Sequence, residues 1–151
     1  MKTFKDTTGQ DWTITLTLGT AMHVRDKLNI DLLQPEVGDP PLLTRLGTDE
    51  MLMGEVLCAL LDDQIEKSNI TAEQMRERFD GPTLLAAQNA FYDELADFFR
   101  LRGRSDRAKA CRKQQALINK AIELAAIKID GMDVDKIVDG VMSGTLPGQS
   151  E

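Results

Sequence analysis

The feature that most constrains this chain is the run MLMGEVLCALL, from Met51 to Leu61, in which Glu55 is the only charged residue. A helix that is apolar on nearly every side is buried on most of them. Thr48 supplies an N-cap residue before the run, and charged residues return after it, up to Lys67. We therefore predict a central helix from the Thr48 cap to about Lys67. The alternative interpretation is that one side of this helix is an exposed docking surface.

Residues 1–18 have strand periodicity instead. Met1 to Asp6 is typical of a short polar strand that carries Phe4, and the turn after it contains Gly9, which is free to adopt a positive φ. In the next segment apolar residues alternate with threonines, as in a strand with one buried face. Its apolar positions are Trp12, Ile14, Leu16 and Leu18. Because an isolated hairpin is marginal in water, we expect its apolar face to rest on helices.

Helical patterns follow the hairpin. Thr20 is a suitable cap for a short helix. The apolar residues of that helix are Ala21, Val24 and Leu28. Asn29 to Pro41 is punctuated by proline and glycine, which predicts a loop, and we expect Leu32 and Leu33 to anchor this loop in the core. A short helical turn from Leu42 to Leu46 completes the segment.

A short helix and a long helix come next. Thr71 and Gln74 have the spacing of a capping box for a helix that ends near Phe79. The triplet Asp80-Gly81-Pro82 stops that helix and starts the next, because proline is favoured in a first helical turn. The long helix ends at Gly103, a suitable C-cap. Its core stripe is Leu84, Phe91, Leu95 and Phe98, flanked by Leu85, Tyr92 and Phe99.

The remaining helices complete a mainly α fold. Ser105 is expected to cap a helix to about Ile129, which forms an antiparallel hairpin with the helix before it. Asp133 caps a last short helix up to Met142, and the aperiodic tail over residues 144–151 is expected to be disordered. We predict one domain over residues 1–143, with a β-hairpin in 1–18 packed on a bundle of about five to six helices in 20–142.

Charge is distributed unevenly along the chain. The net charge is −7; residues 1–75 carry 6 basic and 13 acidic side chains, whereas residues 76–151 carry 12 of each. Between Arg100 and Lys113, Asp106 is the only acid among seven basic residues. We call these seven residues the basic cluster. They are Arg100, Arg102, Arg104, Arg107, Lys109, Arg112 and Lys113.

The basic cluster has three interpretations. Arg100 and Arg102 follow a helix C-terminus, where the macrodipole favours cations, so a solvated corner needs no function. Arg104 and Arg107 begin the next helix, where exposed N–H groups and arginines make a plausible anion site. Its ligand is then an acidic protein surface, such as the acidic first half of a second copy, or a phosphate or nucleic acid. The negative net charge and the lack of interleaved aromatic residues disfavour nucleic acid.

Residues arranged for catalysis are not visible. His23 is the only histidine, and no Ser-His-Asp arrangement can be built on it. Asp62 and Asp63 point about 100° apart on a helix, so they are not a catalytic pair. The sequence contains no phosphate loop, dinucleotide fingerprint or nucleophile elbow. We expect neither an enzyme nor a cofactor.

Metal binding and thiol chemistry are not indicated either. Four aspartates near the C-terminus resemble cation ligands, but their spacing does not match a calcium-binding loop, and the second of them is better explained as a helix cap. These are Asp130, Asp133, Asp135 and Asp139. Cys58 and Cys111 each fall on an apolar helical stripe, where free cysteine behaves as a small hydrophobe. We predict two core cysteines; the alternative is a disulfide or a reactive thiol.

The sequence also bears on the compartment. No apolar stretch reaches the roughly 20 residues of a membrane span. The N-terminal residues MKTFKDTTGQ lack the apolar core of a secretory signal. Together with two unpaired cysteines, these features favour a cytoplasmic location.

Several segments together resemble a known family. They are Phe4, Trp12 and Ile14; Val24-Arg25-Asp26, Leu28 and Asp31-Leu32-Leu33; Gly38-Asp39-Pro40-Pro41-Leu42-Leu43-Thr44-Arg45-Leu46; and Asp97-Phe98-Phe99-Arg100 with Gly103-Arg104. This combination resembles the tail assembly chaperones of tailed phages and prophages, which are encoded near the tape-measure gene. The resemblance covers residues 1–112, and no segment is diagnostic alone.

The resemblance implies a non-enzymatic binding protein in the cytoplasm of a host bacterium. Its partners would be the tape-measure protein, whose apolar stripes it would cover, and the tail-tube protein. The resemblance does not specify contact residues. From the residues themselves, we expect partner contacts at Arg100, Arg102, Arg104, Arg107, Arg112, Met51 and Met53.

Other functions remain open. One alternative is a minor structural protein of the tail or the head–tail connector. Another is a small nucleic-acid-binding or regulatory protein that uses the basic cluster. Self-association is also open, because the hairpin edge and the apolar surface of Met51 to Leu61 could both support it.

Overall fold

The structure begins with the predicted hairpin. In the computed structural model, which describes residues 1–130, strand β1 (Lys2–Lys5) pairs with β2 (Asp11–Ile14) in an antiparallel register that sets Phe4 opposite Trp12. Gly9 has a φ of 86°, which confirms the predicted glycine turn. Phe4, Trp12 and Ile14 are buried.

The second strand is shorter than predicted. Leu18 was expected on the buried strand face, but it is 64% exposed as the first residue of helix α1 (Leu18–Leu28). Thr17, not Thr20, is the N-cap, and Thr20 is the third residue of a capping box with it. The strand stops because side chains satisfy its backbone: the buried carboxylate of Glu94 accepts the Leu16 N–H (2.9 Å).

The outer edge of β2 is also closed by a side chain. Gln64 accepts the backbone N–H of Thr13 (2.9 Å) and donates to its carbonyl (2.7 Å), so it occupies the place of a third strand. An edge closed in this way is a poor template for another strand. Self-association through the hairpin edge stays a prediction, but strand addition at Thr13 would have to displace Gln64.

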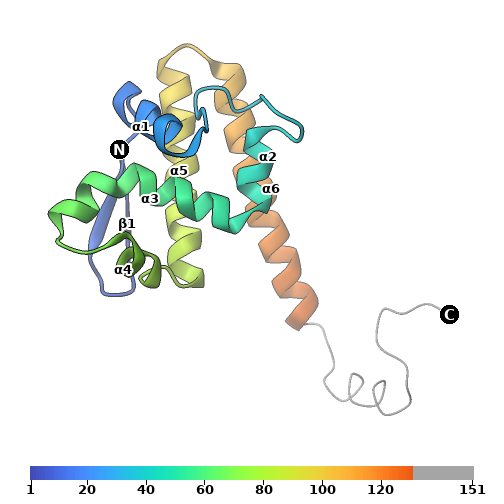
Figure 1. The fold of residues 1–151 in the computed structure, drawn as a ribbon. Helices are drawn as coiled ribbons and strands as arrows, with labels where there is room; N and C mark the ends of the chain where they lie inside the picture. Colours follow the sequence, from blue (N-terminus) through green and yellow to red (C-terminus); the bar gives the residue numbers. More distant parts are fainter. Residues whose placement is uncertain (131–151) are drawn as a thin grey trace. The chain divides into compact units, whose positions relative to one another are not determined.

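Six helices follow the hairpin within the described residues (Figure 1). They are α1 (Leu18–Leu28), α2 (Leu42–Thr48), α3 (Glu50–Lys67), α4 (Ala72–Glu77), α5 (Gly81–Leu101) and α6 (Ser105–Asp130). The predicted fold class, mainly α with a small N-terminal hairpin, is confirmed. The helix expected from Asp133 to Met142 and the tail 144–151 lie outside the described residues.

Helix α3 is central, as predicted. It packs against α1, α2, α4, α5 and β2, and eight of its residues are buried. They are Met53, Val56, Leu57, Cys58, Ala59, Leu60, Leu61 and Ile65. Its N-cap is Asp49, whose carboxylate accepts the Leu52 N–H (3.1 Å), and not the predicted Thr48, which is the last residue of α2.

Loop 29–41 and helices α4 and α5 largely agree with the predictions made from the sequence. Leu32 is fully buried, whereas Leu33 is only half-buried. The capping box predicted at Thr71 is present, and α5 starts at the predicted triplet, with Asp80 as its N-cap. The C-cap of α5 is Arg102, one residue before the predicted Gly103, which follows it with a φ of 77°. In the predicted stripe of α5, Phe91 and Leu95 are buried, whereas Leu84 and Phe98 are only half-buried. Phe99, which was predicted on the flank, is buried, so the buried face is rotated toward Phe99.

The chain divides into two units, one from Met1 to Ala116 and one that begins at Leu117. Every buried side chain in the described part belongs to the first unit. In that unit, Gln115 donates to Asn89 (3.2 Å) and Asp93 (3.0 Å), which confirms the antiparallel pairing of α5 with α6. The prediction of one domain over residues 1–143 extends past the described residues and stays a prediction.

Candidate functional site

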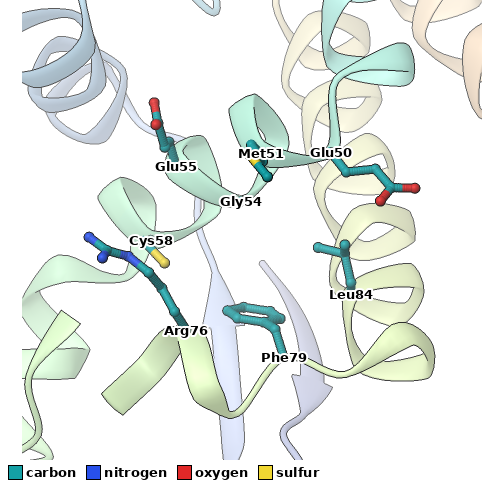
Figure 2. Close-up of a pocket in the computed structure, with 8 residues that line it drawn as sticks. All are labelled: Glu50, Met51, Gly54, Glu55, Cys58, Arg76, Phe79 and Leu84. Carbon is teal, nitrogen blue, oxygen red and sulfur yellow. The ribbon is translucent and has the colours of Figure 1, made fainter. Parts of the chain in front are cut away.

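The candidate site is a groove on the first unit, bounded by α3, α4 and α5. Its volume is about 420 Å³, which falls in the range of roughly 300–1,000 Å³ found for ligand clefts. We call it the α3 groove. Figure 2 shows the residues that line it, which are Glu50, Met51, Gly54, Glu55, Cys58, Arg76, Phe79 and Leu84.

Gly54 makes the gap in the α3 wall. It lies inside a helix, and a Cβ atom placed on it would have no neighbour within 4 Å. Glycine inside a helix costs about 1 kcal/mol relative to alanine. Neither backbone conformation nor packing in this chain requires a glycine at position 54. The open space that it leaves is therefore the most specific feature of the groove.

Met51 stands beside this gap. It is 83% exposed, more than any other large apolar residue that the structure describes. Methionine is flexible and polarisable, so it adapts to varied apolar partners. Met53, which we also predicted as a partner contact, is only 1% exposed and belongs to the core. Residues two apart on a helix do not face the same side, which accounts for the correction.

Charged side chains surround the apolar lining. Glu50 and Glu55 come from α3, whereas Arg76 comes from α4 (Figure 2). All three are exposed, and none of them makes an ion pair within residues 1–130. The α3 side of the groove therefore offers two uncommitted carboxylates to a ligand.

The far wall of the groove is held by the hairpin. Phe79 stacks on the ring of Phe4 at a centroid distance of 5.7 Å. The neighbouring Arg78 donates to the buried carboxylate of Asp6 (3.0 Å). The wall that faces Gly54 is thus anchored, and the groove is preformed rather than built on a loose loop.

Both cysteines are buried and free, as predicted. Burial raises the pKa of the Cys58 thiol, which lines the groove, and it raises the pKa of Cys111 to about 12. A thiol with a raised pKa is protonated at neutral pH and is a poor nucleophile. Cys58 therefore supplies apolar surface to the groove.

The predicted anion site at the start of α6 is largely occupied by the protein itself. Arg104 pairs with Asp106 (2.9 Å). Arg107 turns back to the loop, where it donates to the Leu33 carbonyl (2.7 Å) and pairs with Glu36 (2.5 Å). Arg107 therefore fastens loop 29–41 to α6, a structural role that the sequence did not indicate.

The other predicted arginines are mostly paired as well. Arg100 lies 3.7 Å from Asp97. Arg112 pairs with Asp93 and lies 3.8 Å from Asp97. Arg102 is exposed and makes no ion pair in the described part of the chain. The basic cluster thus presents less free positive charge than its sequence suggests.

His23 and the aspartate pair have structural partners. His23 lies 2.7 Å from Asp62, which also binds Lys27 (2.7 Å), whereas Asp63 pairs with Lys67 (2.8 Å). The two aspartates diverge, as predicted. Across residues 1–130, no group of three or more His, Cys, Asp or Glu side chains could hold a metal ion. Candidate ligands Asp133, Asp135 and Asp139 lie outside those residues.

No family model, curated protein or solved structure matches this chain. None of the helices in the described residues is both long enough and apolar enough to cross a membrane.

Part of this site could be predicted from the sequence. The sequence placed Met51 on a partner surface and left open an exposed side of α3. It did not find Arg76, Phe79 or Leu84, because these residues reach α3 only through tertiary packing. Gly54 was a visible signal: a glycine in the middle of an apolar helix whose composition gives no reason for it.

Proposed function

We propose that this protein is a non-enzymatic phage morphogenesis protein, a tail assembly chaperone that binds apolar helical segments of the tape-measure protein. We also propose that it assists assembly of the tail-tube protein and acts in the cytoplasm of a host bacterium. The observation that carries the binding role is the α3 groove, where Gly54 leaves a gap beside the exposed Met51. The resemblance of residues 1–112 to tail assembly chaperones supplies the class of partner.

The groove suits an apolar side chain carried on a helix. Its apolar floor, with Phe79 and Leu84, would take one or two such side chains through the gap at Gly54. Met51 would close over them. A tape-measure helix that is held in this way would hide its apolar stripe from other chains until the tail tube forms around it.

The test is a tagged capture from cells that express the phage or prophage tail proteins, with and without nuclease. We expect the wild-type chain to recover a large helical tail protein, and nuclease to have no effect. Gly54→Leu should lose this partner, because the leucine side chain fills the gap. Gly19→Leu is the matched control, since it places the same side chain at an exposed glycine of α1, where a Cβ would meet the Thr17 hydroxyl at an ordinary contact distance of 3.6 Å.

Three results would contradict the proposal. Equal capture by Gly54→Leu and Gly19→Leu would remove the groove from the binding surface. Loss of every partner after nuclease would favour the nucleic-acid alternative. Retention of the protein in finished particles would favour the minor structural component.

A further inference from the structure

A second cavity lies within the first unit, where α5 turns into α6 (Figure 1). Its volume is about 540 Å³, which is also in the range found for ligand clefts. Helix α1, loop 29–41, the end of α5 and the start of α6 each supply part of its wall, and it shares no lining residue with the α3 groove. We call it the arginine hollow. It is lined by Leu18, Leu33, Phe98 and Phe99 together with Arg102, Arg104 and Arg107.

One part of this lining is hydrocarbon. Leu18 is 64% exposed at the start of α1, and Leu33 and Phe98 are only half-buried. Phe99 is buried and contributes from the side of the core. A ligand that removes the three partly exposed side chains from water gains hydrophobic free energy in proportion to the apolar area it covers.

The rest of the lining consists of guanidinium groups. Arg104 pairs with Asp106 (2.9 Å), and Arg107 pairs with Glu36 (2.5 Å), so both arginines bring their own counter-charge. Arg102 is exposed and makes no ion pair within residues 1–130. The uncommitted charge on the wall of the arginine hollow is therefore the cation of Arg102.

Arg107 adds an unsatisfied donor to the same wall. Its Nη1 donates to the Leu33 carbonyl (2.7 Å) and its Nη2 to Glu36. Its Nε is buried and has no hydrogen-bond partner in the described part of the chain. A buried donor without an acceptor costs free energy. The arginine hollow thus combines apolar surface with an uncommitted cation and an unmet N–H group.

We propose that the arginine hollow binds a small organic acid that consists of one carboxylate on an alkyl or aryl body. The carboxylate pairs with Arg102, because a guanidinium group can give a carboxylate two parallel N–H···O bonds. The apolar body covers Leu18, Leu33 and Phe98. The site lies outside the α3 groove and requires no phage protein, so this inference goes beyond the proposed function.

The lining favours a hydrocarbon body over a peptide. None of the seven lining residues carries an uncharged polar side chain, and the Leu33 carbonyl already accepts from Arg107. A peptide would bury its amide groups against hydrocarbon, and burying an amide without a hydrogen bond is costly. A bare anion such as acetate would leave the apolar part of the wall uncovered.

The test is a titration of the full chain with three probes: octanoate, octanamide and acetate. Calorimetry measures the affinity, and amide chemical shifts in NMR spectra locate the site. Octanoate should bind saturably and shift the signals of the lining residues. Octanamide has the same body without the charge, and acetate has the charge without the body. Each should bind at least about tenfold more weakly than octanoate.

Two substitutions separate the charge from the apolar wall. Arg102→Gln should weaken octanoate binding about tenfold and leave octanamide binding unchanged. Its matched control is Arg45→Gln, at an exposed arginine of α2 that lies outside the lining and makes no ion pair within residues 1–130. Leu18→Ser should weaken both octanoate and octanamide, whereas Leu101→Ser, at an exposed leucine outside the lining, should weaken neither. Circular dichroism establishes that each variant is folded.

Four outcomes would overturn the inference. Octanoate that does not bind would exclude the site, and equal affinities for octanoate and octanamide would remove the charge of Arg102 from it. Chemical-shift changes centred on Gly54 and Phe79 would place the ligand in the α3 groove. Tighter binding of acetylated trileucine with a free carboxylate than of octanoate would show that a peptide end is preferred. Capture of a tail protein depends on the α3 groove, so the two proposals fail independently.

Discussion

At the residue scale, the buried carboxylate of Asp6 ties the hairpin to the end of α4. It accepts hydrogen bonds from the Thr8 hydroxyl (2.6 Å), the Trp12 indole (2.8 Å) and the Arg78 guanidinium (3.0 Å). It also accepts backbone N–H groups of Thr8 (2.8 Å) and Gln10 (3.1 Å). Burial by itself raises the pKa of Asp6, but these hydrogen bonds outweigh it and hold the pKa well below its ordinary value of 3.8.

This network makes stability depend on pH. Because the pKa of Asp6 is lower in the folded chain than in the unfolded chain, its contribution is complete above about pH 4–5 and is lost as the pH falls. Asp6→Asn should lower the free energy of unfolding at pH 7 by about 2–3 kcal/mol. Urea unfolding from pH 7 to pH 3 checks this. The gap between wild type and variant should narrow toward pH 3, and curves that stay parallel would contradict the role of Asp6.

At the element scale, helix existence could be read from the sequence better than helix ends. The capping box at Thr71, the start at Asp80 and the end near Gly103 were predicted, because each combines a cap residue with a break in periodicity. The starts of α1 and α3 were misplaced, since two good cap residues lie close together. The N-cap of α3 is Asp49, because Thr48 is still part of α2.

The same limit applies to the site. The side of α3 that carries Met51 could be predicted from its own periodicity. The groove needs Arg76 and Phe79, which are close to α3 only because Phe79 stacks on Phe4 of the hairpin. The pairing of Arg107 with Glu36 joins segments 71 residues apart, which local pattern cannot reveal.

The assignment of the α3 cap can be tested directly. Asp49→Ala removes the carboxylate that accepts the Leu52 N–H, and it should lower the free energy of unfolding by about 1 kcal/mol. Thr48→Ala, the adjacent control, removes only a hydroxyl that donates to the Thr44 carbonyl, and its effect should stay within about 0.5 kcal/mol. Chemical denaturation measures both. The reverse order would restore Thr48 as the cap.

At the scale of the whole molecule, the core belongs to the first unit. The last buried side chain in the described residues is Cys111, whereas Leu117, Ile122, Leu124 and Ile127 are all exposed. Folding of the first unit should therefore not depend on the second half of α6.

A chain that ends at Ala116 tests this division. It should unfold cooperatively, with a melting temperature within about 3 °C of the full chain measured at low concentration. Calorimetry measures both the cooperativity and the melting temperature. A truncated chain that fails to fold would show that residues beyond Ala116 stabilise the core.

Gly54 also determines what a laboratory selection for heat resistance would find. Alanine at this position should gain about 1 kcal/mol of helix stability, and the open space around it sets no steric limit on larger residues. A library screened only for survival on heating would enrich such replacements and progressively close the groove. A second screen, for capture of a partner, should return glycine. Enrichment of opposite residues at one position in the two screens would separate the demands of folding from those of binding.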